Sequence, residues 1–220
     1  MTWGQRRRAL VGATVCLLVV GLLAWMVSGD RAPLGSIDGT GRTAEAFTAH
    51  HAWLVPLLRV VEVSFATVGM IVWSSIVTAA LLYRRRFRAA AWVVVVMVTT
   101  SVATSLLKIA LARGRPSWQD HVHLVASKSF PSGHASSTAA LAGMLVVLLW
   151  GQAHHSRGHL VAVLLLVATW LVVCLDRVLL GRHYPTDVVA GSALGVAVML
   201  FGLAILDPIP MAPRSSSSSA

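Results

Sequence analysis

Two histidines stand where turn-forming residues give way to long apolar runs. His134 ends the sequence PSGH at residues 131–134, and His183 lies four residues before Asp187. A carboxylate at that spacing can accept an imidazole N–H, which fixes the tautomer and raises the basicity of the other ring nitrogen. This arrangement prepares a histidine to act as a nucleophile or a base. A solvent-facing pair at a helix start is the alternative interpretation.

The PSGH sequence also has the features of an anion site. Ser132 is a favoured N-cap residue, so a helix that begins just after it would present free backbone N–H groups and the positive end of its macrodipole. Such a terminus binds phosphate groups, and Gly133 lets an anion approach the backbone closely. His134 would then lie in the first turn, beside the anion. An ordinary capped helix start is the alternative here.

Three cationic side chains accompany the histidines. Lys108 and Arg115 are seven residues apart, close to two helical turns, so a helix would place them on nearly the same face. Pro116 disfavours helical backbone at Arg115, which predicts that the helix ends near this arginine. Arg177 lies shortly before His183. A lysine late in a membrane span can instead extend its amine to the interface, which is the structural alternative for Lys108.

The composition indicates a membrane protein. Of the 220 residues, 56% are hydrophobic and 12% are charged, whereas a soluble domain has roughly 25% charged residues. The formal net charge of +10 would suggest nucleic-acid binding in a soluble protein. Here much of it lies in short clusters beside apolar segments, where it reports membrane orientation, so we expect no nucleic-acid partner. Cys16 and Cys174 lie within apolar runs and have neither metal-ligand nor disulfide spacing.

Six apolar segments are long enough to cross a bilayer, which takes about 20 helical residues. Because an open sheet edge cannot lie in lipid, all six are expected to be helices, and the fold class is an all-α polytopic membrane protein. Gly39 and Gly41 are assigned to a polar loop after the first segment, and residues 213–220 to a disordered cytoplasmic tail. The six predicted spans are about 9–27, 60–83, 89–112, 134–150, 160–179 and 186–206.

Arginine clusters predict the orientation of these spans. Residues 6–8 precede the first span and four arginines within residues 84–88 separate the second from the third, so both clusters are expected to be cytoplasmic. Both termini then face the cytoplasm, and the outward ends of spans three to six carry all the site residues described above. The first span also resembles a signal peptide, but its long apolar core and the lack of a clear cleavage site favour a retained anchor.

Three motifs, in this order, resemble the type 2 phosphatidic acid phosphatase family of membrane lipid phosphatases. They are K-x6-R-P at residues 108–116, P-S-G-H at 131–134 and R-x5-H-x3-D at 177–187. The resemblance implies one integral membrane phosphatase domain over residues 1–212, similar to bacterial phosphatidylglycerophosphatase-like and undecaprenyl-diphosphatase-like members. The family usually has serine before the third arginine, where this chain has Asp176. That carboxylate, next to the phosphate-binding cations, can weaken binding or change substrate preference.

The resemblance also implies roles for the site residues. His183 attacks phosphorus to form a phosphohistidine, Asp187 orients it, His134 protonates the leaving oxygen, and water then hydrolyses the intermediate. Five residues are implied to hold the phosphoryl oxygens: Lys108, Arg115, Ser132, Gly133 and Arg177. No metal ion or other cofactor is expected, and the outward loops themselves provide cations but no carboxylate cluster for magnesium. His121 and His123 form an H-x-H pair, for which a solvated loop is favoured over a metal site.

The predicted function is hydrolysis of a lipid phosphate or diphosphate on the outer side of a bacterial plasma membrane. Prenyl diphosphate, phosphatidate and phosphatidylglycerol phosphate are candidate substrates, because a lipid already in the membrane reaches a site at span ends. A non-catalytic binder or transporter of phosphorylated lipid is the alternative. The motifs also resemble vanadium-dependent haloperoxidases, against which the six spans argue. Arg59 and Glu62 either pair at the interface or shape the access of a headgroup, and Arg182 and Tyr184 are candidates to line that access.

Overall fold

The computed structural model describes residues 1–29, 34–119, 127–150 and 157–208. Every regular element within these ranges is an α-helix, which confirms the predicted all-α class. In chain order the helices are α1 (Trp3–Ser28), α2 (Leu34–His50), α3 (Leu54–Ser64), α4 (Thr67–Tyr83), α5 (Phe87–Leu111), α6 (Gly133–Trp150), α7 (Arg157–Leu179) and α8 (Pro185–Leu206). His121, His123 and residues 213–220 lie outside the described residues.

The helices form a bundle with a strongly apolar outer surface. Five of them are long and apolar enough to cross a membrane, and the bent pair of α3 and α4 makes a sixth candidate. Exposed valine, leucine and isoleucine side chains cover the outside of α1, α4, α5 and α7. Apolar surface on this scale is typical of helices that face lipid. The predicted multi-span membrane fold is therefore confirmed.

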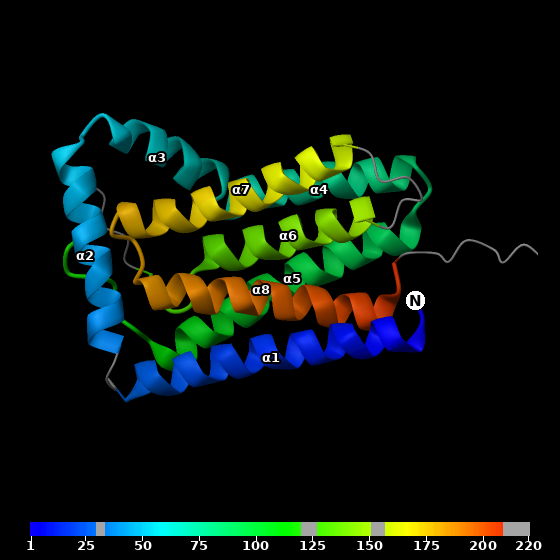
Figure 1. Ribbon diagram of the computed structural model, residues 1–220, viewed down its shortest axis with the longest axis horizontal. Coiled ribbons are helices and arrows are strands. Elements are labelled where there is room, and N and C mark those ends of the chain that lie inside the picture. Colours follow the sequence, from blue (N-terminus) through cyan, green and yellow to red (C-terminus); the bar gives the residue numbers. More distant parts are fainter. Residues whose placement is uncertain (30–33, 120–126, 151–156, 209–220) are drawn as a thin grey trace, which may run out of the picture.

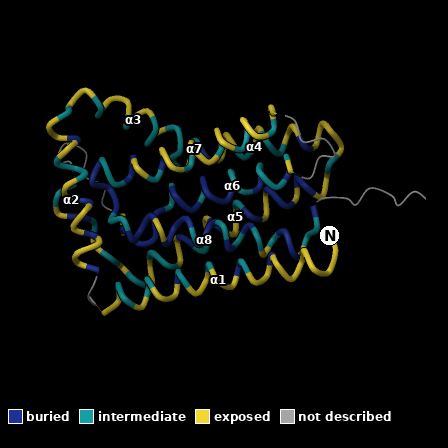
Figure 2. The backbone as a smooth tube through the Cα atoms, in the orientation of Figure 1, coloured by how far each residue is buried: buried dark blue, intermediate teal, exposed yellow. Residues whose placement is uncertain are grey.

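Helix α8 lies at the centre of the bundle, between α1, α5 and α6 (Figures 1 and 2). In the apolar 18-residue stretch of each helix, 50% of the residues are buried in α8, against 11% in α1 and 6% in α7. The core between α5, α6 and α8 includes Trp92, Val96, Met144 and Met199. The central helices thus form the packed core, while α1 and α7 present most of their surface to the bilayer.

Two glycines bring α8 very close to α6. A Cβ atom added at Gly191 would lie 2.4 Å from the carbonyl oxygen of Ser132, and one added at Gly195 would lie 2.1 Å from that of Ser136. Small residues four positions apart commonly allow membrane helices to approach in this way. The contact holds the start of α6 beside the start of α8, where the two histidine motifs lie.

Two of the expectations for the first half of the chain are wrong. The predicted span 60–83 is not one helix, because the chain bends by 56° between α3 and α4. The polar loop expected after the first span contains α2, so Gly39 and Gly41 are helical. The buried residues of α2 include Leu34, Asp38 and Gly41, which follow helical spacing on one face. Glycine and threonine have weak helix propensity, so the contacts of this face stabilise a helix that composition did not indicate.

The two ends of the bundle differ in chemistry. At one end the Met1 amino group pairs with Asp207 at 2.7 Å, Arg6 donates to the Ala204 carbonyl oxygen at 2.7 Å, and Arg88 donates to that of Leu206 at 3.0 Å. The amino terminus, the α4–α5 turn and the end of α8 therefore meet there. At the opposite end, α2 crosses the bundle (Figure 1). The arginine clusters thus share one end of the molecule, and the motif residues lie at the other.

Candidate active site

The PSGH segment forms the start of α6. The carbonyl oxygen of Ser132 accepts a bond from the backbone N–H of Ser136 at 3.0 Å, and α6 begins at Gly133. The backbone N–H of Ser132 donates to the carbonyl oxygen of Asp187 at 2.9 Å, which ties this turn to α8. Ser132 is fully buried, and its hydroxyl has no partner among the described residues. Of the two donors of Ser132, the backbone N–H is thus engaged by Asp187 and the hydroxyl is left without a bond among the described residues.

The second motif lies in the turn between α7 and α8. Gly181 adopts the left-handed conformation with φ +62°, which lets the chain reverse after α7, and α8 begins at Pro185. His183 follows this turn, and its Nδ1 lies 3.5 Å from Oδ2 of Asp187. The same oxygen accepts the backbone N–H of Tyr184 at 3.0 Å. The predicted pair is therefore brought together, at a distance slightly longer than a hydrogen bond, as is common in unliganded active sites.

The environment of His183 keeps its ring neutral. The side chain is only 3% exposed. Burial lowers its pKa to about 4, although the carboxylate of Asp187 acts in the opposite direction. With Nδ1 facing Asp187, the lone pair lies on Nε2, which is 3.5 Å from Nη1 of Arg115. At neutral pH His183 can therefore act as a nucleophile through Nε2.

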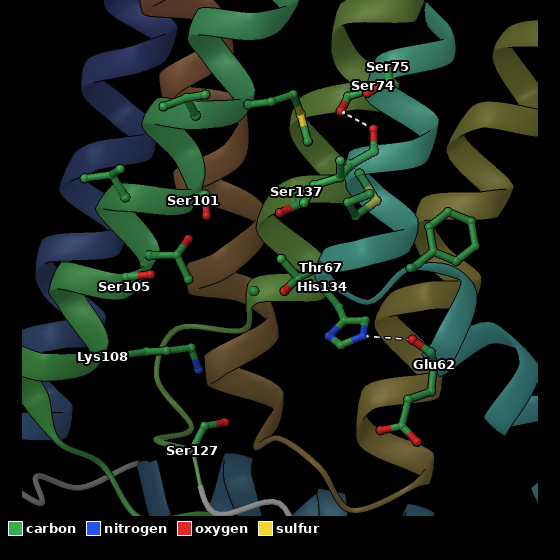
Figure 3. A pocket seen from close by; sticks show the side chains of 18 of the residues that line it. Glu62, Thr67, Ser74, Ser75, Ser101, Ser105, Lys108, Ser127, His134 and Ser137 are labelled. Carbon is green, nitrogen blue, oxygen red and sulfur yellow. Dashed lines mark hydrogen bonds between the residues drawn. The ribbon is translucent and has the colours of Figure 1, made fainter.

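A cavity of about 790 Å³ joins most of the predicted site residues. Those that line it are Lys108, Arg115, Gly133, His134, Arg177 and His183. Ser132 and Asp187 lie behind this wall and are completely buried. Figure 3 shows Lys108 and His134 directed into the cavity from different helices. Sequence positions that are up to 75 residues apart thus form one concave surface with both cations and histidines.

The cations are held by backbone and side-chain oxygens around this cavity. Lys108 donates to the carbonyl oxygen of Lys128. Arg115 donates through Nε to the carbonyl oxygen of Ser127 at 2.7 Å and through Nη2 to its hydroxyl at 2.9 Å. Burial lowers the pKa of Arg115 to about 10, so its guanidinium remains charged at neutral pH. These contacts fix two positive charges before any substrate enters.

Arg177 is paired with two carboxylates. Asp176 accepts bonds from its Nε at 2.7 Å and from its Nη2, and Glu62 of α3 lies 3.0 Å from its Nη1. Glu62 also pairs with Arg59 at 2.7 Å, as in the first alternative for these two residues. It lines the cavity as well, which agrees with the second alternative, a part in headgroup access. Asp176, which stands in place of the family serine, is completely buried, and its ion pair neutralises part of the charge of Arg177.

Two residues of this region, Arg113 and Asp38, were not singled out from the sequence. Nη1 of Arg113 lies 2.6 Å from Oδ1 of Asp187, and Nη2 lies 2.5 Å from Oδ2 of Asp38 on α2. Its guanidinium also stacks on the Tyr184 ring at 3.9 Å. Asp38 accepts the backbone N–H of Thr186 at 3.1 Å and its hydroxyl at 2.8 Å.

The same network holds the carboxylate that faces His183. Burial opposes the charge of Arg113, but Asp187 and Asp38 outweigh it and raise the pKa of Arg113. The only sequence signal for Arg113 was its place inside the K-x6-R-P motif. Asp38 had none, because its partners are far away in the chain.

No group of three or more histidine, cysteine, aspartate or glutamate side chains suited to a metal ion occurs within the described residues. His121 and His123 lie outside them, so the structure does not address that pair. The cavity instead combines buried guanidinium groups, a helix start and two imidazole rings. Such a site can bind a phosphoryl group, attack it, and exchange a proton with a leaving oxygen.

Comparison with known proteins identifies a family and several phosphatases among the relatives. Residues 89–208 match the PAP2 superfamily. The chain is 32% identical over 175 residues to a decaprenylphosphoryl-5-phosphoribose phosphatase of Mycobacterium tuberculosis, which is 77% of this chain and 89% of that protein. It is 34% identical over 110 residues to a lipid A 1-phosphatase of Rhizobium etli, but this is 44% of the chain and only 42% of that relative's length.

A solved structure shares the fold. The crystal structure of a transmembrane PAP2 type phosphatidylglycerolphosphate phosphatase from Bacillus subtilis matches with a TM-score of 0.75, and the match covers 86% of this chain and 93% of that one. The sequence identity is 23%, so this likeness concerns the fold alone. The family predicted from the three motifs is thus confirmed by the sequence match over more than half of the chain, and the protein belongs to the PAP2 superfamily.

Proposed function

We propose that the protein removes a phosphomonoester or diphosphate headgroup from a membrane lipid, through a phosphohistidine on His183 and without a metal ion. Its family and the phosphatases among its relatives support a lipid phosphatase. The observation that carries the proposal is the single cavity in which two imidazole rings and several cations meet. An intact nucleophile, proton donor and orienting carboxylate argue for catalysis rather than for binding alone.

The chemistry follows from the ring nitrogens. Nε2 of His183 attacks phosphorus, and a P–N bond forms as the bond to the leaving oxygen breaks. The Nε2 of His134 lies 3.0 Å from the carbonyl oxygen of Glu62, which can only accept, so this nitrogen carries a proton. In its doubly protonated form the ring gives this proton to the leaving oxygen.

The second half of the reaction uses the same residues in reverse. His134 takes a proton from water, the water oxygen attacks phosphorus, and the P–N bond breaks to release inorganic phosphate and free His183. Lys108, Arg115 and Arg177 stabilise the charge on the phosphoryl oxygens in both steps. Asp187 stabilises the positive charge that develops on His183.

The shape of the cavity supports a lipid substrate. From Lys108 it continues along α5 to Val94 and along α4 to Leu82, passing Ser101 and Ile71. Fourteen residues separate Lys108 from Val94, which is about 21 Å of helix. An apolar chain can follow this path while its phosphate lies at the histidines. The relatives act, by their names, on decaprenyl-linked, lipid A and phosphatidylglycerol phosphates, so all of these classes belong in a substrate panel.

The orientation rests on the arginine clusters. Residues 6–8 and 84–88 lie at the end of the bundle opposite α2 (Figure 1). Positive charge at a helix end favours the cytoplasmic side. We therefore place both termini in the cytoplasm and the end of the cavity that holds the two histidines on the extracytoplasmic side of a bacterial plasma membrane, with residues 1–212 as one phosphatase domain.

The experiment is phosphate release by the detergent-purified protein in the presence of EDTA. The panel contains phosphatidate, phosphatidylglycerol phosphate, a long-chain prenyl diphosphate and a prenyl-linked phosphosugar. We expect wild type and the control His50→Ala, which alters an exposed ring on α2, to release phosphate. His183→Ala should be inactive, and rapid quenching of the wild type should trap an acid-labile phosphohistidine. Activity in His183→Ala, or loss of wild-type activity with EDTA, would contradict the mechanism.

A further inference from the structure

Glu62 lies against two buried arginines that line the cavity. Its Oε1 lies 3.0 Å from Nη1 of Arg177 and 3.3 Å from Nε of Arg182. Both arginine side chains are nearly inaccessible, at 2% and 1% exposure, and both line the cavity together with Glu62. Carboxylates and phosphates bind guanidinium groups through the same kind of anionic oxygen. Glu62 therefore engages donors that a bound phosphate would use.

The backbone of Glu62 engages the proton donor as well. Its carbonyl oxygen lies 3.0 Å from Nε2 of His134, and Figure 3 shows the imidazole ring turned toward it. The leaving oxygen of a substrate must reach this same nitrogen, so the carbonyl and the leaving group exclude each other. One residue thus covers both a pair of phosphate-binding cations and the acid.

The helix that carries Glu62 is weakly anchored. Helix α3 has no fully buried residue, and the chain bends by 56° where it meets α4. Moving α3 therefore exposes little core, which is typical of segments with low local stability. One turn earlier, Arg59 pairs with Oε2 of Glu62 at 2.7 Å. Because both partners belong to α3, Glu62 keeps a counter-charge when it leaves Arg177.

We infer that Glu62 is an internal competitor for the phosphate site, which the substrate's phosphate displaces and which returns to help expel inorganic phosphate. The inference rests on the proposed phosphatase function and names a residue that sets phosphate affinity. A cavity lined by Lys108, Arg115, Arg177 and Arg182 would otherwise retain the released dianion. When Glu62 occupies the arginines in most molecules, phosphate can bind only to the remaining fraction, and its apparent affinity is reduced by that fraction. Glu62 thereby determines both KM and product inhibition.

The direct test is binding of inorganic phosphate to the full-length protein in detergent. Glu62→Gln preserves size and removes the competing charge. Glu45→Gln removes the same charge from α2, at a side chain that does not line the cavity. We expect Glu62→Gln to bind phosphate at least about tenfold more tightly, the lower bound for one charge-assisted hydrogen bond, and Glu45→Gln to match wild type. Unchanged or weaker binding in Glu62→Gln would mean that Glu62 positions the arginines instead, and would overturn the inference.

A second measurement uses the native Glu62 and so does not depend on the folding of that variant. Val60 on α3 is 65% exposed and suits a spin label on Val60→Cys, in a chain whose Cys16 and Cys174 are replaced by serine. Addition of inorganic phosphate should increase the mobility of the label, because phosphate releases α3. An identical spectrum at saturating phosphate would refute the displacement of α3.

The outcomes separate this inference from the proposed function. If no lipid phosphate is hydrolysed but Glu62→Gln tightens phosphate binding, the competitor stands and the phosphatase proposal fails. If lipid phosphates are hydrolysed while Glu62→Gln leaves phosphate binding and product inhibition unchanged, the phosphatase stands and the competitor fails.

Discussion

The substitution Asp38→Asn tests whether α2 helps to position the nucleophile from outside the cavity. Asp38 accepts Nη2 of Arg113 at 2.5 Å and the Thr186 hydroxyl at 2.8 Å, and it is only 4% exposed. An asparagine has one acceptor oxygen, so its amide nitrogen would face a donor of Arg113 or of Thr186. Breaking a buried ion pair costs about 3–5 kcal/mol. Because Arg113 keeps Asp187 and is 16% exposed, we expect the lower end, about 3 kcal/mol.

The expected effect on turnover follows from the same contacts. Arg113 holds Oδ1 of Asp187 at 2.6 Å, and Asp187 orients His183. A displacement of about 1 Å at a reacting group costs up to about 100-fold in rate. We therefore expect kcat to fall by about 10- to 100-fold in Asp38→Asn, with a much smaller change in KM, because the phosphate-binding cations are untouched.

The assay is steady-state phosphate release from the best lipid of the panel, together with thermal unfolding in detergent. Glu45→Gln provides the matched control, since it removes a carboxylate from the same helix at a side chain that lies near Gly181. A kcat within twofold of wild type, in a folded Asp38→Asn protein, would refute the positioning role. A rise in KM with kcat unchanged would instead place Asp38 in substrate binding.

Two further predictions concern the charges of the site. Burial lowers the pKa of His183 to about 4, so we expect kcat/KM to fall through protonation of the enzyme only as the pH approaches 4. A fall near pH 6.5 that is the same for lipid phosphates of different acidity would contradict this, because it would show a histidine with an ordinary pKa. Asp176→Ser removes the carboxylate 2.7 Å from Nε of Arg177 and leaves more positive charge for the substrate, so KM should fall several-fold. A raised KM would mean that Asp176 mainly holds Arg177 in place.

Much of the fold follows from local sequence properties. The apolar runs that form α5, α6, α7 and α8 begin and end within about three residues of the predicted bounds, because span length and hydropathy depend on neighbouring residues alone. The turn before α8 also depends on local chemistry, because Gly181 adopts the left-handed conformation and α8 begins at Pro185. By contrast, α2 was expected to be a loop, because its helical state depends on contacts that residues 34–50 make with distant parts of the chain.

The candidate site divides in the same way. Residue type and spacing alone predicted that His134, His183 and Asp187 would meet with three cations, and they indicated the family that the comparisons confirmed. Tertiary structure alone decided what surrounds them: Asp38 reaches Thr186 across 148 positions, and Glu62 reaches Arg177 across 115. A motif records which chemical groups are present over a short stretch. Which carboxylate neutralises which arginine depends on how the helices pack, and no periodicity within a helix carries that information.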